Sequence, residues 1–303
     1  MALFRHGVLS LTSWFHHPSI NQHYEVLCRG SVTCLDESKT DTLSLIASHH
    51  VCSPFRFPQH YDQPFLSSLS EEHVRFSIEV RDMNGSILSQ IRLDPTRATV
   101  FGHKIRDIAS LPLHRLEFDT LRKGAASSNV SIKPVKLVSS SSLSSSSSSS
   151  SKQAVYEGLE LDFIGHFLSP SIDPNTGEDI SLLIPKNIPG LVKLRTRQTF
   201  AATNEILEMG FCGGAVLKRR QGKNDSTSSN SGSVGSEKDE STLECVGVVE
   251  GIVPIANNTT STEVNITDNR GIINPTNGID QAKKLLAGCA VFVEANEIRE
   301  LLR

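Results

Sequence analysis

One cysteine of the sequence stands in a setting that suits a nucleophile. Cys212 lies in the run Gly210-Phe211-Cys212-Gly213-Gly214, and apolar residues typical of a strand follow it directly. A glycine turn of this kind holds a side chain clear of its own backbone, and Gly210 can direct its main-chain N–H toward the same point. The run predicts a thiol nucleophile, with the amides of Gly210 and Cys212 as an oxyanion hole. The alternative interpretation is a strand end with a small buried thiol.

A thiol nucleophile needs a base that takes its proton and usually an acid that orients the base. The chain has 11 histidines, and all of them precede Cys212. This order excludes an α/β-hydrolase arrangement, in which the histidine follows the nucleophile. His49 and His50 end one apolar run, and Asp107 opens another. The candidates for the base are therefore His49 and His50. The candidate acid is Asp107, for which the alternatives are a strand cap or a plain ion pair with Lys104 or Arg106.

The elements that must hold these residues are short strands. Residues 74–81 alternate in polarity, which is typical of a half-buried strand, and Asn84-Gly85 predicts a hairpin turn into residues 87–93. Similar segments occur along both halves of the chain, at residues 24–28, 30–35, 43–48, 98–101, 108–113, 159–164, 181–184, 191–194, 198–202, 244–253 and 288–293. The first half shows no sustained helical periodicity. The pattern predicts an all-β fold of two β-barrels, with one short C-terminal helix at residues 294–303.

Low-complexity segments divide the chain. Residues 139–151 are almost entirely serine, and such a tract cannot bury enough apolar area to offset the entropy lost on ordering it. A second polar insertion covers residues 218–242. We expect an N-terminal tail or transit segment at residues 1–23 and a first barrel at residues 24–122. A flexible serine-rich linker should cover residues 123–155, and a second barrel with the terminal helix residues 156–303.

The overall composition argues against several classes of function. The net charge of the 303 residues is −3, with 30 basic and 33 acidic residues, so we expect neither nucleic acid nor a membrane surface as a partner. No apolar run reaches the roughly 20 residues that cross a bilayer. The six cysteines show no zinc-binding spacing. We therefore expect no metal and no other cofactor.

The cysteines and the N-terminus also bear on the compartment. A chain of this length needs no disulfides to build a core, so we interpret the six cysteines as free thiols in a reducing, intracellular compartment. Residues 1–23 contain no acidic residue, and Arg5 is their only arginine. This composition is compatible with an organelle transit peptide, and a plain N-terminal tail is the alternative.

Four motifs, taken in chain order, resemble those of the trypsin-like peptidases. The run Leu45-Ile46-Ala47-Ser48-His49-His50-Val51 resembles the T-A-A-H motif of that family, and this match gives His50 the catalytic place. Asp107-Ile108-Ala109-Ser110-Leu111 resembles the D-[IL]-A-[LV]-[LI] motif, with Asp107 as the orienting acid. Gly210-Phe211-Cys212-Gly213-Gly214-Ala215-Val216 resembles G-[DN]-S-G-G-P-[LV]. The fourth, Gly247-Val248-Val249-Glu250-Gly251-Ile252, resembles the strand that pairs with substrate.

The resemblance covers residues 24–122 and 156–303 and implies both fold and activity. It implies two chymotrypsin-like barrels, with a cleft between them in which a peptide or protein substrate is cleaved. Its catalytic residues would be His50, Asp107 and Cys212. A cysteine in a G-x-C-G-G turn is similar to the nucleophile of viral chymotrypsin-like cysteine proteases.

The same resemblance assigns the substrate contacts. It places Ile206 at the floor of the specificity pocket, and Glu250 and Gly251 in the strand that binds substrate. The sequence departs from the family where Ala215 replaces the usual proline and where the polar insertion 218–242 follows. These departures leave a second hypothesis open, in which an inactive trypsin-like scaffold binds peptides or proteins.

Overall fold

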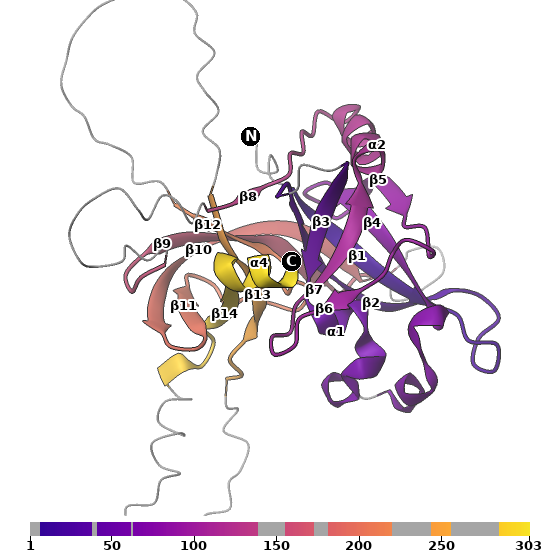
Figure 1. The fold of residues 1–303 in the computed structure, drawn as a ribbon, viewed down its shortest axis with the longest axis horizontal. Coiled ribbons are helices and arrows are strands. Elements are labelled where there is room, and N and C mark those ends of the chain that lie inside the picture. Colours follow the sequence, from indigo (N-terminus) through magenta and orange to yellow (C-terminus); the bar gives the residue numbers. More distant parts are fainter. Residues whose placement is uncertain are drawn as a thin grey trace, which may run out of the picture.

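The computed structural model is built mainly from β-strands, which form two sheets that lie side by side (Figure 1). The structure describes residues 7–37, 41–61, 63–138, 155–172, 181–219, 244–255 and 285–303. The predicted fold class, two chymotrypsin-like β-barrels followed by a short C-terminal helix, is confirmed. The serine-rich run 139–151 and most of the insertion 218–242 lie outside the described residues.

The first half is a curled, fully antiparallel sheet with the strand order β5-β4-β1-β2-β3-β7-β6. Its strands are β1 (Val8–Phe15), β2 (Glu25–Leu35), β3 (Thr42–Ala47), β4 (Val74–Arg81), β5 (Ile87–Arg92), β6 (Phe101–Gly102) and β7 (Ala109–His114). The predicted hairpin joins β4 to β5, and Gly85 supplies its left-handed residue with φ +83°. The predicted strands 24–28 and 30–35 are one continuous strand, β2.

Strand β1 corrects the expected boundary of the first barrel. Residues 1–23 were expected to lie outside it, yet β1 is hydrogen-bonded between β2 and β4 and is almost completely buried. Its polar side chains are buried because they have a polar partner: the hydroxyls of Ser10 and Thr12 both donate to the carboxylate of Glu79. The first barrel therefore includes residues that the sequence suggested to be a tail.

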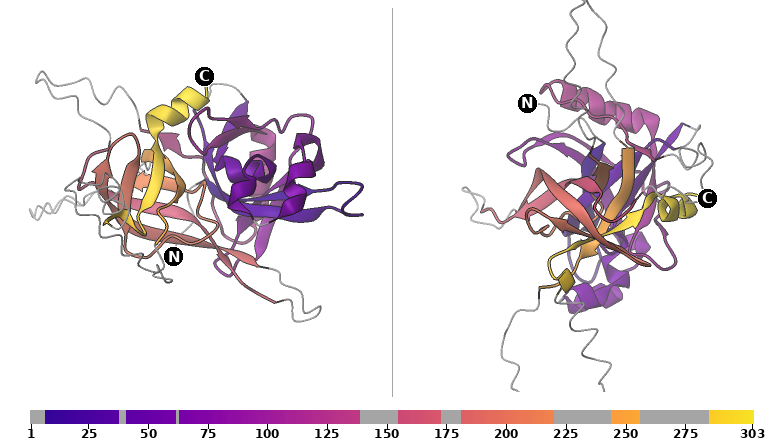
Figure 2. Two further views of the ribbon diagram at one scale, coloured as in Figure 1. Left: turned by 90° about the horizontal axis from the view of Figure 1, so that it is seen from below. Right: turned by 90° about the vertical axis from the view of Figure 1, so that its left-hand side faces the viewer.

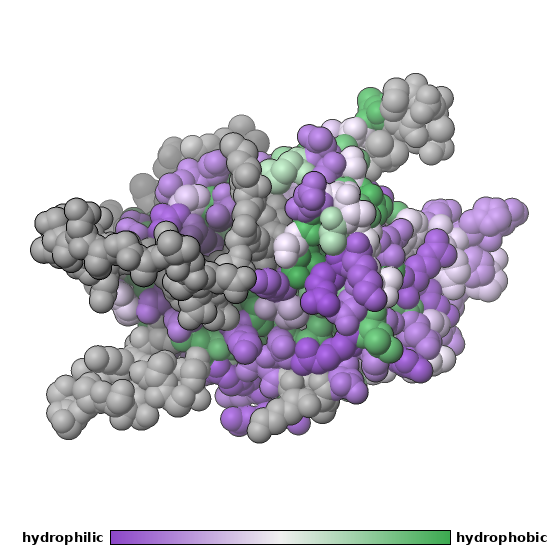
Figure 3. Space-filling view, turned by 90° about the horizontal axis from the view of Figure 1, so that it is seen from above, coloured by the Kyte–Doolittle hydropathy of each residue, from purple (hydrophilic) through white to green (hydrophobic). Residues whose placement is uncertain are grey.

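A second correction concerns the helix α2 (Arg115–Ala126), which the sequence analysis did not predict. Its buried side chains, Phe118, Leu121 and Ala125, are spaced as one face of a helix. The edge strands β5 and β6 of this sheet are not paired with each other in the described part of the chain. Helix α2 contacts β4 and β5 near one edge and β7 near the other, and so covers the gap between the two edges. The side of the molecule that carries α2 is mostly hydrophilic, with small hydrophobic areas (Figure 3).

Between β3 and β4 the chain forms a series of short helical turns. They are α1 (His49–Cys52) and the 3₁₀ turns η1 (Pro54–Arg56), η2 (Pro58–His60), η3 (Pro64–Ser68) and η4 (Glu71–His73). Prolines at the first positions of η1, η2 and η3 fix the backbone angles needed there. This segment covers one end of the first barrel.

The second half is a closed barrel with the strand order β12-β9-β10-β11-β14-β13, completed by pairing of β12 with β13. Its elements are β9 (Glu160–Ser169), β10 (Leu182–Arg195), β11 (Thr199–Thr203), β12 (Ala215–Lys218), β13 (Glu244–Ile252), β14 (Ala290–Glu294) and α4 (Ala295–Leu301). The predicted strands 181–184 and 191–194 are parts of the single strand β10. The two halves share a strand topology. In the first, β1, β2 and β3 are consecutive neighbours, β4 pairs with β1, and β7 pairs with β3. In the second, β9, β10 and β11 are consecutive neighbours, β12 pairs with β9, and β14 pairs with β11.

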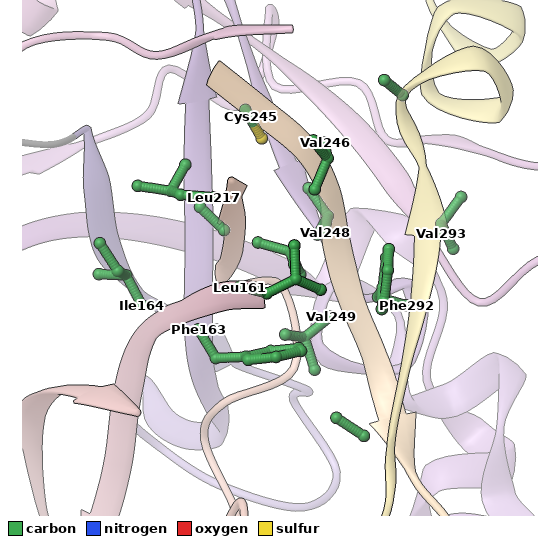
Figure 4. Packing of buried hydrophobic residues seen from close by; sticks show 14 of the residues in the cluster. Leu161, Phe163, Ile164, Leu217, Cys245, Val246, Val248, Val249, Phe292 and Val293 are labelled. Atoms are coloured by element: carbon green, nitrogen blue, oxygen red, sulfur yellow. The ribbon is translucent and has the colours of Figure 1, made fainter. Parts of the chain in front are cut away.

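The core of the second barrel is made of aliphatic and aromatic side chains from facing strands. Figure 4 shows Leu161 and Phe163 of β9 near Val249 of β13 and Phe292 of β14. The rings of Phe163 and Phe292 meet edge to face, with centroids 6.1 Å apart. The same core extends into the first half, because Ile46 and Ile108 belong to it. The two halves therefore pack against each other through apolar side chains.

The connection between the halves begins later than expected. The predicted linker started at residue 123, inside α2, but Ile132, Val135 and Leu137 are buried. Strand β8 (Lys136–Leu137) pairs in parallel with β13, so this stretch runs from the first barrel onto the second. The C-terminal helix α4 lies where the two halves meet (Figure 2). No helix among the described residues is long and apolar enough to cross a membrane.

Candidate active site

His50 and Asp107 lie together because their strands are neighbours. Strands β3 and β7 are antiparallel, with Ala47 opposite Ala109, so the residue that follows β3 meets the residue that precedes β7. The His50 backbone N–H donates to Asp107 Oδ1 (2.9 Å), and His50 Nδ1 is hydrogen-bonded to Asp107 Oδ2. His49 differs: its ring packs edge to face on Phe57. Of the two candidate histidines, only His50 has the aspartate as a side-chain partner in the described structure.

Cys212 completes a series of three polar side chains. Its half-buried thiol interacts with the ring of His50 closely enough to act on the pKa of that residue. Burial alone lowers the pKa of His50, but the hydrogen bonds to Asp107 and Cys212 outweigh it and raise the pKa to about 10. The raised pKa favours the imidazolium form of His50 beside the carboxylate of Asp107. The structure brings together the three residues that the sequence analysis selected as catalytic.

The turn that carries Cys212 depends on two glycines in the left-handed region. Gly210 has φ +97° and Gly213 has φ +91°. A Cβ atom on Gly213 would lie 2.1 Å from the Ser31 carbonyl oxygen, and one on Gly210 would lie 2.9 Å from the His166 carbonyl oxygen. Both positions thus exclude a side chain on two counts, backbone conformation and space.

Strand β2 of the first barrel holds this turn from across the interface. The Ser31 N–H donates to the Cys212 carbonyl (3.1 Å), and the Ser31 hydroxyl donates to the Gly210 carbonyl (2.7 Å). The Thr33 hydroxyl donates to the Gly213 carbonyl (2.8 Å). Three carbonyls of the second-barrel turn are therefore fixed by two residues of the first barrel.

The amides of Gly210 and Cys212 are oriented through the carbonyls that precede them. The Met209 carbonyl accepts from the Leu168 N–H (2.7 Å), and the Phe211 carbonyl accepts from the Gly214 N–H (2.9 Å). In a planar trans peptide the N–H points away from the C=O of the same peptide unit. The hydrogen bonds to the Met209 and Phe211 carbonyls therefore also fix the directions of the Gly210 and Cys212 N–H groups. Within the described residues neither N–H has a protein acceptor. Two N–H groups held in this way beside a thiol are the donors that an oxyanion hole requires.

The expected substrate-binding residues differ in their surroundings. Ile206 is 53% exposed, and a Cβ built on Gly288 would lie 3.9 Å from it and 3.7 Å from Ile255. Space is open above Gly251, where a Cβ would meet no atom within 4 Å. The carboxylate of Glu250 instead contacts protein groups: it accepts from the guanidinium of Arg106 and from the Asp107 N–H. The Glu250 side chain therefore belongs to the support of Asp107 rather than to an open binding surface.

Tyr61 is a site residue that the sequence analysis missed. Its hydroxyl donates to the His50 carbonyl (2.9 Å) and lies 3.3 Å from the thiol of Cys28. The ring of His60 also lies near the His50 ring, with centroids 5.3 Å apart. These contacts come from the turns after α1, in a segment outside the strands that the sequence predicted. The spacing of residues along this segment carries no signal that one tyrosine turns back toward His50.

No group of three or more His, Cys, Asp and Glu side chains in the described ranges is placed to hold a metal ion. No protein-family model matches the chain, and no curated protein is similar enough to match it. We therefore infer the function from the geometry of the site.

Proposed function

We propose that the protein is a trypsin-like peptidase that hydrolyses peptide bonds with Cys212 as its nucleophile. The observation that carries this proposal is the series Asp107–His50–Cys212, in which Asp107 is hydrogen-bonded to His50 and the sulfur of Cys212 acts on the same ring from the second barrel. Two amides without a protein acceptor lie in the same turn as the thiol. A nucleophile, a base, an orienting acid and an oxyanion hole are the parts that acyl transfer needs.

The chemistry follows from the charge on each group. The His50 imidazolium favours the thiolate of Cys212, because the two charges stabilise each other. The thiolate attacks the carbonyl carbon of the substrate, and the amides of Gly210 and Cys212 donate to the oxyanion that forms. His50 then gives its proton to the leaving amine as the C–N bond breaks, which leaves a thioester. Water attacks the thioester while His50 takes its proton, and the acid product leaves with the thiolate restored.

Asp107 has two tasks in this scheme. Its Oδ2 binds His50 Nδ1, so the other ring nitrogen is left to serve the thiol and the substrate. Its negative charge also stabilises the imidazolium, which adds to the raised pKa of His50. The intracellular location is part of the same proposal, since all six cysteines are free thiols and such thiols persist in reducing compartments.

We expect the enzyme to prefer an apolar residue before the scissile bond and to disfavour lysine and arginine. Ile206, at the expected pocket floor, lies near Gly288, which also lies near Ile255, and an apolar floor leaves a basic side chain without a partner for its charge. A peptide library that varies this residue, read by mass spectrometry of the cleavage products, measures the preference. Cleavage mainly after lysine or arginine would contradict the assignment and point instead to the exposed Glu208.

The same library separates the enzyme from the inactive scaffold. Wild-type protein should cleave peptides and Cys212→Ala should not, while both bind them. If peptides bind to the wild type and are never cleaved, the protein is a peptide-binding module and the catalytic proposal is wrong.

A further inference from the structure

A buried ion pair joins the two barrels directly beside the proposed catalytic acid. Arg106, in the first half, has a side chain only 6% exposed, and its guanidinium reaches the carboxylate of Glu250 on β13. Nε donates to Oε1 (3.0 Å) and Nη2 donates to Oε2 (2.6 Å), which is the two-pronged geometry of a strong arginine–carboxylate pair. Such a pair fixes both distance and angle between the groups that carry it.

The same carboxylate binds the backbone of the catalytic acid. The Asp107 N–H donates to Glu250 Oε1 at 2.9 Å. Glu250 can reach this position because β13 is irregular there: Val249 pairs with Phe292 and Gly251 with Val291, which leaves Glu250 as an extra residue. A bulge of this kind turns the side chain away from its regular direction. Glu250 therefore holds Asp107 from the second barrel, although Asp107 belongs to the first.

Arg106 also makes contacts beyond Glu250. Its Nη1 donates to Glu297 Oε1 of helix α4 (2.9 Å) and to the Arg197 carbonyl (3.1 Å). Burial acts to lower the pKa of Arg106, but the hydrogen bonds and charges of Glu250 and Glu297 raise it, so the guanidinium stays charged. One first-barrel cation thus binds strand β13, helix α4 and the turn before β11.

We propose that Arg106 and Glu250 are positioning residues, which set the alignment of His50 in the first barrel with Cys212 in the second. His50 is fixed to Asp107, Asp107 is fixed to Glu250, and Glu250 belongs to the barrel that carries Cys212. The inference rests on the proposed function, because it assigns a task only if His50 serves Cys212. A small displacement between a base and its nucleophile has a large effect on rate.

The substitution Glu250→Gln tests this inference. Glutamine keeps the size of the side chain but has one carbonyl oxygen, which cannot serve both prongs of Arg106 and the Asp107 N–H. We expect kcat for peptide cleavage to fall about 10-fold with KM nearly unchanged, and the rate of Cys212 alkylation by iodoacetamide below pH 7 to fall by a similar factor. Both are measured well below the thermal midpoint of each variant, so that loss of folded protein does not contribute.

Glu294→Gln is the matched control. Glu294 accepts two hydrogen bonds from Arg195 in the same two-pronged way (2.6 and 3.0 Å), and its side chain is 15% exposed against 12% for Glu250. It makes no contact with Asp107 among the hydrogen bonds of the described residues. This control should lose stability to a comparable degree and keep the kcat and alkylation rate of the wild type. Equal rates in Glu250→Gln and Glu294→Gln would overturn the inference.

Two further outcomes keep the test decisive. If Glu250→Gln does not fold, Arg106→Lys takes its place, because lysine keeps the charge but offers no planar two-pronged donor. A wild-type alkylation rate in Arg106→Lys would then contradict the positioning role, and a reduced rate would support it.

If Cys212 of the wild type is itself no more reactive than the other cysteines, the proposed function fails. If Cys212 of the wild type is more reactive than the other cysteines and the variants keep the wild-type rates, the proposed function stands and this inference alone is wrong.

Discussion

Replacement of His50 by alanine is expected to reduce kcat/KM for peptide hydrolysis by about four orders of magnitude or more. The substitution removes both the imidazolium that favours the thiolate and the donor that protonates the leaving amine. Initial rates on the best peptide from the library measure the loss. Cys212→Ser should retain the fold and also lose most activity, because a hydroxyl is a far weaker acid than a thiol.

The neighbouring histidine supplies a close control for this effect. His49→Ala removes the same type of side chain one position earlier, but the His49 ring packs on Phe57 and does not bind Asp107 Oδ2. We expect this variant to stay within a few-fold of the wild type. A comparable loss in both variants would mean that the damage comes from α1 as a whole and not from the base.

Asp107→Asn is expected to lower kcat/KM by about 10³-fold, less than His50→Ala. Asparagine can still accept from the His50 backbone N–H, but it removes the charge that stabilises the imidazolium. The sign of the pH effect follows: without the contribution of Asp107 the pKa of His50 falls from its raised value of about 10, so the imidazolium is lost at a lower pH. The basic limb of the pH profile of kcat/KM should therefore move to lower pH.

Asp162→Asn is the control for this substitution. Asp162 is also a partly buried aspartate in an ion pair, with Arg219, but it lies on β9 and makes no contact with the site residues in the described structure. It should leave both the rate and the pH profile unchanged. A basic limb of Asp107→Asn at the same pH as the wild type would exclude the electrostatic role given to Asp107.

The features that the sequence predicted are those encoded by local pattern. Residues 74–81 alternate in polarity and form β4 with the same limits. Gly210 and Gly213 have the left-handed conformations that a glycine turn suggests. The chain order of histidine, aspartate and cysteine selected residues that lie together, because two strand ends and one turn meet at a single place.

The features that escaped prediction depend on partners far along the chain. The lack of acidic residues made residues 1–23 look like a tail or transit segment, and the burial of Ser10 and Thr12 within them depends on Glu79, far along the chain. Helix α2 has three buried residues on one face, too short a pattern to stand out beside the strands. Glu250 was assigned to the strand that binds substrate, because nothing local marks the bulge that turns it toward Arg106 and Asp107.

The central claim is that His50 activates Cys212, and alkylation measured residue by residue tests it most directly. Cys28 is the internal reference: it is half-buried like Cys212, but burial raises its pKa to about 11. With iodoacetamide between pH 5 and 9, read by mass spectrometry, Cys212 should react at least about 10-fold faster than Cys28 below pH 7. The difference should disappear in His50→Ala and persist in His49→Ala. If Cys212 reacts below pH 7 no faster than Cys28, or keeps its rate in His50→Ala, the account is contradicted.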